Sequence, residues 1–174
     1  MTLQRQVVES SLVLSRFRAG FYGGLILALF VGVFLIWLWQ PERQVERHTE
    51  NFLHAIEQKN WSRAADFIGN DYQDQWGDDR ARVVERAREF FRYLRSFRLS
   101  FSTATVNIDH RRATWISKIT IEGGQGEVMA EVKERVNSLT KPFELEWRRI
   151  SAKPWNWKLA RVGNPDLEIP AGFE

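Results

Sequence analysis

The most prominent pattern in the chain is an uninterrupted apolar run near its N-terminus. Residues 21–39 carry no charge, and twelve of these nineteen residues are Leu, Ile, Phe or Val. A helix of that length spans about 28 Å, close to the ~30 Å hydrocarbon core of a bilayer. A cleaved signal peptide has a shorter apolar region that ends at small residues, whereas this run ends in Trp37-Leu38-Trp39-Gln40-Pro41. The pattern therefore predicts an uncleaved transmembrane helix over residues 21–39.

Flanking charge predicts the orientation of this helix. Arg16 and Arg18 precede the span, whereas Arg43 and Arg47 follow it among glutamates. Positive residues favour the cytoplasmic side. Residues 1–20 are thus expected to be a short cytoplasmic tail. The chain is expected in the inner (cell) membrane as a single-pass protein whose C-terminal domain is extracytoplasmic, and periplasmic if the source is bacterial.

Small residues recur at every fourth position around the apolar run, namely Gly20, Gly24, Ala28 and Gly32. This spacing lets two membrane helices approach closely. It suggests a homodimer or contact with another membrane protein. The alternative is that glycine is simply common in membrane helices.

After Pro41 the apolar positions follow a helical period. One amphipathic helix is predicted from Glu42 to about Lys59, and a short second helix follows with Ser62 as its cap. Asp78 or Asp79 is expected to cap a third helix from Arg80 to about Arg95. Its predicted inner face consists of Val83, Val84, Ala87, Phe90, Phe91 and Leu94.

From residue 97 the period changes to two, which indicates strands. Phe97, Leu99 and Phe101 alternate, but Val106 and Ile108 have the opposite parity, so a bend is expected at 102–105. Turns are predicted at 109–112 and at the glycine-rich 123–126. The remaining predicted strand positions are Ala113 to Ile121, then Val128, Ala130, Val132 and Val136, then Phe143 to Trp147, and finally Trp155, Trp157 and Leu159.

This order of elements predicts an α+β domain. Three helices would pack on a curved antiparallel sheet of four to five strands, over residues 40–164. Residues 165–174 would form an irregular C-terminal tail.

The predicted order resembles the nuclear-transport-factor-2-like superfamily, also called ketosteroid-isomerase-like, whose domains are cone-shaped. The segments that carry the resemblance are Phe52-Leu53-His54-Ala55-Ile56, Asn60-Trp61-Ser62-Arg63-Ala64-Ala65, Phe143-Glu144-Leu145-Glu146-Trp147-Arg148 and Trp155-Asn156-Trp157-Lys158-Leu159. The superfamily contains enzymes, binding domains and assembly proteins, so the fold does not specify the function. A membrane helix before such a domain is also similar to the bitopic inner-membrane component of type IV secretion machines.

Composition excludes several function classes. The chain has no cysteine, which removes disulfides, thiolate nucleophiles and cysteine-bound zinc. After residue 20 it carries 22 basic and 21 acidic residues. A nearly neutral domain lacks the basic surface of a nucleic-acid-binding protein, so no nucleic-acid partner is expected.

The best candidate for acid–base chemistry is the loop around Tyr72. Asp71 or Asp74 could act as a carboxylate base beside the tyrosine hydroxyl, as ketosteroid isomerases use such groups. The alternative is a capped loop in which Asp71 binds backbone donors and Tyr72 packs on the sheet. No metal-binding or phosphate-binding motif is present, so neither a metal nor another cofactor is predicted.

Two further sets of residues are candidates for contacts. Trp76, Trp115 and Trp147 could line a ligand pocket, although core packing is the alternative. Arg82, Arg86, Arg88 and Arg92 on the third helix could bind anionic lipid or an acidic partner, although a solvated face is the alternative.

The leading hypothesis is a membrane-anchored, non-enzymatic interaction or ligand-binding domain, with the lipid bilayer as one partner. One alternative is a membrane-tethered isomerase- or hydratase-like enzyme with its site near Tyr72. Another is an assembly factor of a membrane secretion complex. An open polar cavity in the cone would favour the enzyme or a ligand-binding domain, and a filled one a scaffold.

Overall fold

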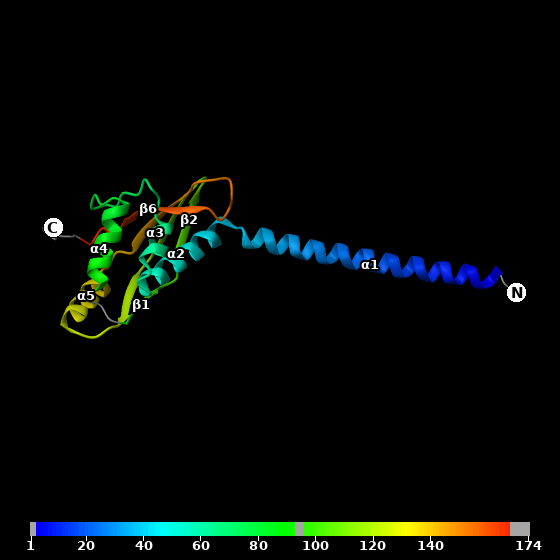
Figure 1. Ribbon diagram of the computed structural model, residues 1–174, viewed down its shortest axis with the longest axis horizontal. Helices are drawn as coiled ribbons and strands as arrows, with labels where there is room; N and C mark the ends of the chain where they lie inside the picture. Colours follow the sequence, from blue (N-terminus) through cyan, green and yellow to red (C-terminus); the bar gives the residue numbers. More distant parts are fainter. Residues whose placement is uncertain (1–2, 93–95, 168–174) are drawn as a thin grey trace. The chain divides into compact units, whose positions relative to one another are not determined.

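The structure is a computed structural model that describes residues 3–92 and 96–167. The chain divides into two compact units, Met1–Gln40 and Pro41–Glu174. Figure 1 shows the order of the elements from the N-terminus to the C-terminus.

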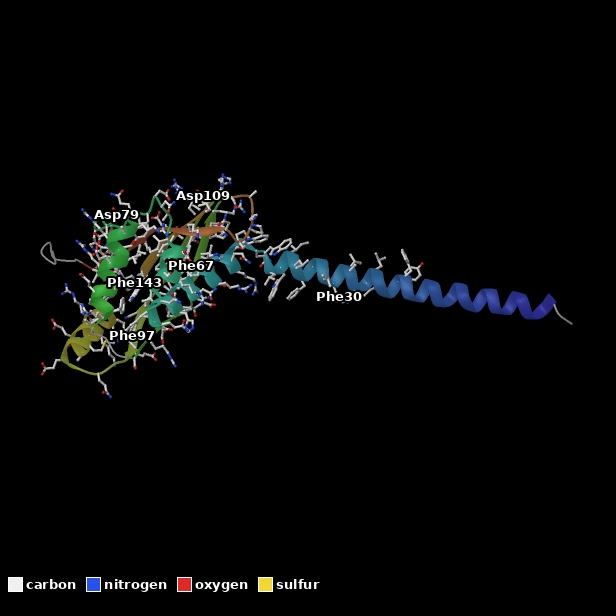
Figure 2. All side chains as sticks on the ribbon, in the orientation of Figure 1. Phe30, Phe67, Asp79, Phe97, Asp109 and Phe143 are labelled. Carbon is white, nitrogen blue, oxygen red and sulfur yellow. The ribbon has the colours of Figure 1, made fainter. Side chains whose placement is uncertain are left out.

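In the first unit the described residues form the helix α1 (Leu3–Leu38). It begins well before the apolar run, because no proline or glycine interrupts residues 3–18. Its segment Phe21–Leu38 is long and apolar enough to cross a membrane, and none of it is buried. Figure 2 labels Phe30 on this segment, whose side chain is 72% exposed.

Three helices open the second unit: α2 (Pro41–Glu57), α3 (Trp61–Phe67) and α4 (Arg80–Arg92). Pro41 suits the first turn of α2, where its missing N–H group costs nothing. Asn60, not Ser62, caps α3, because its Oδ1 accepts the Arg63 N–H at 3.1 Å. Asp79 caps α4 in the same way through the Arg82 N–H at 2.9 Å.

Among the described residues, six strands form two antiparallel sheets. The strands β1 (Phe97–Phe101) and β4 (Ile119–Gly123) pair in one sheet, and the other has the order β2–β3–β5–β6. Its members are β2 (Thr105–Asp109), β3 (Arg112–Ser117), β5 (Phe143–Arg149) and β6 (Trp157–Gly163).

The two sheets are joined by a bend in a long hairpin. The chain leaves β1 and enters β2 at residues 102–104, which confirms the bend predicted from the change of parity. There the Ser117 hydroxyl donates to the Ser102 carbonyl at 3.0 Å, and the Ser102 N–H donates to the Lys118 carbonyl at 3.2 Å. The predicted turn at 109–112 is also confirmed, since Asp109 pairs with Arg112.

The predicted strand at Val128, Ala130, Val132 and Val136 is wrong. Residues Glu127–Ser138 form α5. Val128, Val132 and Val136 lie four residues apart, which fits one helix face as well as a strand. The Asn137 side chain anchors α5 by bonding the backbone of Ile121 in both directions, at 2.9 and 3.1 Å.

The glycine-rich segment therefore leads into a helix and not into a hairpin. Gly124 has φ +75°, and a Cβ atom there would come within 2.5 Å of the Met129 side chain. Only glycine fits this position without a shift of Met129.

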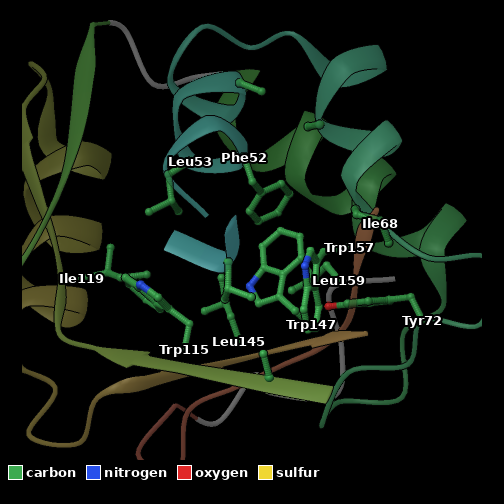
Figure 3. Close-up of a cluster of buried hydrophobic side chains, with 14 residues drawn as sticks. Phe52, Leu53, Ile68, Tyr72, Trp115, Ile119, Leu145, Trp147, Trp157 and Leu159 are labelled. Carbon is green, nitrogen blue, oxygen red and sulfur yellow. The ribbon is translucent and has the colours of Figure 1, made fainter. Parts of the chain in front are cut away.

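The main core lies between α2, α3 and the larger sheet. Trp147 is fully buried, and Trp115 and Trp157 are each 1% exposed. Figure 3 shows Phe52 and Leu53 of α2 facing these indoles and Leu145 and Leu159 of the sheet. The rings of Phe52 and Trp147 pack edge to face, 6.3 Å apart.

The predicted inner faces of two elements need correction. No residue of α4 is fully buried, and Phe90 is 46% exposed, whereas Val83, Val84 and Phe91 are partly buried. Leu94 lies outside the described residues. Trp155 precedes β6 and is 50% exposed, because residues 150–156 form the hairpin loop.

Candidate functional site

The loop that carries Tyr72 runs along the edge of β6. The Gly69, Gln73 and Gln75 N–H groups donate to the carbonyls of Leu159, Ala160 and Val162. This pairing places alternate side chains toward the core, so Tyr72 and Asp74 both point inward, 3% and 7% exposed. Figure 3 shows the hydroxyl end of Tyr72 directed toward Trp147, Trp157 and Leu159.

Tyr72 and Asp74 form a buried polar pair. Burial raises the pKa of the Tyr72 hydroxyl above its usual range, and the charges and hydrogen bonding of Asp74 and the charge of Asp78 raise it further. Burial also raises the pKa of Asp74. Two hydrogen bonds oppose this shift, because the Asp74 carboxylate accepts the Asp78 N–H at 2.8 Å and the Trp76 N–H at 2.9 Å. A tyrosine with a raised pKa is a hydrogen-bond donor at neutral pH and not a base.

Asp78 extends this cluster to α4. Its side chain is 6% exposed and accepts a hydrogen bond from the Arg86 guanidinium at 2.8 Å. Arg86 is 42% exposed and so connects the buried carboxylates to solvent. The cluster is thus a chain of Tyr72, Asp74, Asp78 and Arg86 that secures the start of α4.

The side chains of the other two predicted residues of this loop bind different partners. Asp71 is exposed and pairs with Arg148 on the neighbouring surface. Trp76 is partly buried, and its indole N–H donates to the Leu167 carbonyl at 3.0 Å. The structure therefore brings Tyr72 together with Asp74 and not with Asp71.

Trp115 and Trp147 belong to the hydrophobic core. The indole nitrogen of Trp147 is buried without a hydrogen-bond partner among the described residues. These two tryptophans thus pack into the core against the inner face of the larger sheet.

A shallow hollow lies between α2 and β1 instead. Its volume is about 300 Å³, and its lining residues are Glu50, Asn51, Leu53, His54, Glu57, Leu99 and Phe101. Glu57 accepts the Leu99 N–H at 2.6 Å and meets the His54 imidazole at 3.1 Å. No pattern in the sequence predicted this hollow, although Glu50, His54 and Glu57 have the spacing of one helix face.

The arginines of α4 form an open face. The helix carries five arginines and two glutamates, and Arg82, Arg88 and Arg92 are exposed. The Arg80 guanidinium is bound to Asn70 and the Ala65 carbonyl at 2.8 and 2.9 Å. Of the four predicted contact residues, Arg86 is engaged with Asp78 and the other three project outward.

The small residues of the predicted stripe all lie along one helix, and Gly24 and Ala28 are exposed on its surface. Gly20, Gly24, Ala28 and Gly32 all lie within α1. A Cβ atom at Gly24 or Gly32 would meet no other atom within 4 Å.

The described residues contain no group of three His, Asp or Glu side chains that could hold a metal ion. His110 lies in the turn between β2 and β3, 3.8 Å from Asp109, and both side chains are largely exposed.

Comparison with known proteins supports the fold. The chain has 14% identity to a putative aromatic ring hydroxylase from Novosphingobium aromaticivorans, with a TM-score of 0.53 over 70% of this chain and 85% of that one. An NTF2-like protein of unknown function from Pseudomonas putida gives 10% identity and a TM-score of 0.52, over 70% and 82%. The domain has an NTF2-like fold. This confirms the α+β architecture that the sequence predicted.

The similarity is one of fold and does not extend to sequence, and in one case it covers only part of the similar protein. Bd1075 from Bdellovibrio bacteriovorus gives a TM-score of 0.54 at 7% identity, and the match covers 70% of this chain but only 40% of Bd1075. No protein-family model matches the chain. No curated protein matches it in sequence.

Proposed function

We propose that the protein is a membrane-anchored interaction domain and not an enzyme. The observation that carries this proposal is the aromatic core of the NTF2-like domain, where Trp115, Trp147 and Trp157 are at most 1% exposed. An enzyme of this fold needs a cavity with polar groups that reach a substrate. The buried Tyr72–Asp74 pair stabilises a loop.

The anchor in this proposal is the apolar segment Phe21–Leu38 of α1. Its lack of charge and its length support insertion in a bilayer. The arginines before it favour a cytoplasmic N-terminus and an extracytoplasmic domain.

The binding surface in this proposal is the outer face of α4. Arg82, Arg88 and Arg92 supply positive charge to this face, while the exposed ring of Phe90 lies on the flank of the helix away from Arg88 and Arg92. Arginine and aromatic side chains are enriched where proteins bind one another. The partner would be a membrane protein with an acidic face, as in the assembly of a membrane complex.

The test is purification of the full chain in mild detergent, with three charge reversals on α4. We expect one membrane protein to copurify with the wild type and to be lost from the variant Arg82→Glu, Arg88→Glu, Arg92→Glu. The matched control reverses three exposed charges elsewhere, Arg98, Lys118 and Lys133. Equal recovery from both variants would contradict the role of α4.

The alternative enzyme is tested with the same preparation. Turnover of small carbonyl substrates in an isomerisation or hydration assay, abolished by Tyr72→Phe and Asp74→Asn, would replace the proposal with a tethered enzyme. Turnover that survives both changes would exclude the Tyr72–Asp74 pair and would be tested next with His54→Gln and Glu57→Gln in the hollow between α2 and β1.

A further inference from the structure

The tip of the β5–β6 hairpin, residues 150–156, combines exposed apolar and basic side chains. Ile150 is 48% exposed and Trp155 is 50% exposed, and Lys153 lies between them. Single exposed apolar residues are ordinary on protein surfaces. Two exposed apolar residues at one loop tip indicate a binding surface only if the position and the charge of the tip support it.

The tip contacts α2 at His48, in the middle of that helix. The imidazole of His48 is hydrogen-bonded to the backbone of Trp155 and, at 2.7 Å, to the Gln44 carbonyl of its own helix. His48 is seven residues after Pro41, about 10 Å along the helix axis. The contact of the tip with His48 is therefore about 10 Å along α2 from the point where the second unit joins α1.

The covalent connection limits how far this point can be from the apolar helix. Only Trp39 and Gln40 separate the end of α1 at Leu38 from the start of α2 at Pro41. Three peptide units span roughly 10 Å at most. With Phe21–Leu38 in a bilayer, the start of α2 must lie at the headgroup region, whichever way the domain is turned.

The hairpin segment carries positive charge, whereas the start of α2 is balanced, with Glu42 and Glu46 beside Arg43 and Arg47. The stretch from Trp147 to Pro165 contains no acidic residue. The β2–β3 turn lies at the same end of the domain as the hairpin tip, because the Arg149 N–H donates to the Arg111 carbonyl at 2.8 Å. Figure 2 labels Asp109 in that turn. The segments Asp109–Arg112 and Arg149–Trp155 together contain this one acidic residue and four arginine or lysine residues.

The tip is already ordered. The Ser151 hydroxyl accepts the Lys153 N–H at 3.2 Å and the Asn156 amide at 2.9 Å, and the Ile150 N–H donates to the Asn156 carbonyl at 3.0 Å. A loop held in one conformation loses little entropy when it binds.

From these observations we infer that the β5–β6 hairpin tip is a membrane-docking surface, in which Ile150 and Trp155 enter the interface and Lys153 and Arg111 bind anionic lipid headgroups. Tryptophan favours the bilayer interface, and basic residues near a membrane are attracted to anionic lipid. The inference rests on the proposed anchoring of α1. It adds a second contact that would fix the rotation of the domain above the bilayer and leave α4 to bind a partner.

The absence of cysteine from the sequence makes single-site labelling direct. The full chain carrying Ala152→Cys is labelled with an environment-sensitive fluorophore and reconstituted in vesicles of phosphatidylcholine, with or without phosphatidylglycerol. The matched control is Gln125→Cys, an exposed residue before α5. Alkaline carbonate extraction followed by flotation reports separately whether the chain is integrated.

We expect a blue shift at position 152 with phosphatidylglycerol, and a quenching by brominated lipid that is severalfold larger than at position 125. Lys153→Gln with Arg111→Gln should remove the dependence on phosphatidylglycerol. Trp155→Ser should reduce the quenching, whereas Phe90→Ser on α4 should not.

Equal quenching at 152 and 125 in an integrated chain would overturn the inference and leave the anchor intact. A blue shift at 152 without quenching by lipid would also overturn it, since a protein contact would then cover the tip. Release of the chain by carbonate would refute the anchoring, and with it the inference.

Discussion

The stability of the domain depends on individual tryptophans in very different ways. Trp147 is fully buried at the centre of the core, while Trp155 is half exposed on a loop. Replacing a buried tryptophan with alanine removes apolar contacts and leaves a cavity, whereas an exposed one loses little.

Trp147→Ala is therefore expected to lower the free energy of unfolding by about 3–5 kcal/mol. Trp155→Ala, its matched control, should lower it by roughly 0.5 kcal/mol or less. Urea unfolding of the detergent-solubilised chain, followed by circular dichroism, measures both. Equal losses would contradict the placement of Trp147 in the core.

Two aspartates should give the stability opposite dependences on pH. Burial raises the pKa of Asp74 above 3.8, so the folded state binds its proton more tightly than the unfolded state does. The contribution of Asp74 is therefore largest below pH 3.8 and declines as the pH rises through its folded pKa. Asp74→Asn should remove that decline, because an amide oxygen still accepts the Trp76 and Asp78 N–H groups.

Asp166 provides the opposite case. Hydrogen bonds from the Thr140 hydroxyl and the Lys141 N–H lower the pKa of Asp166 below 3.8. Its contribution is present above pH 3.8 and is lost as the pH falls through its folded pKa. Denaturation midpoints across acidic pH, as differences from the wild type, should therefore change in opposite directions for Asp74→Asn and Asp166→Asn.

At the scale of elements, mutation can distinguish the two candidate N-terminal caps of α3. Ser62 was the predicted cap, but Asn60 accepts the Arg63 N–H. Asn60→Ala should reduce the free energy of unfolding by about 1 kcal/mol, as the loss of a cap usually does. Ser62→Ala should leave it within about 0.5 kcal/mol, since serine there is an exposed helical residue. A larger loss from Ser62→Ala in urea unfolding would restore the predicted cap.

The helix α5 shows how an element escapes a sequence-based prediction. Valines favour strands, and positions 128, 132 and 136 satisfy both a period of two and a helical period. The helix is selected by contacts that no local pattern contains. These are the burial of Met129 beside Phe97 and Ile121, and the two hydrogen bonds of Asn137 with Ile121.

For the whole molecule, the main question is whether α1 associates with a second copy. The stripe of Gly20, Gly24, Ala28 and Gly32 predicts that it does. Gly24→Ile with Ala28→Ile should strongly reduce the signal in a membrane two-hybrid assay. Gly23→Ile is the matched control, because Gly23 has the same open surroundings but lies off the stripe. If the two variants keep equal, undiminished signals, the stripe has no role in association.

The sequence by itself determined what depends on local period and composition. These features are the apolar segment, α2 to α4, the bend between β1 and β2, the turn at 109–112 and the α+β class of the domain. Each follows from spacing along the chain, where one buried face requires one repeat.

Only the tertiary structure decided what depends on residues far apart in sequence. In the folded domain Trp115 and Trp147 are buried in the core, Tyr72 pairs with Asp74, and Asp71 forms an ion pair with Arg148. Folding also places the β5–β6 hairpin tip beside His48, more than a hundred residues earlier in the chain. These contacts arise from strand register and packing, which the alternation of side chains limits but does not specify.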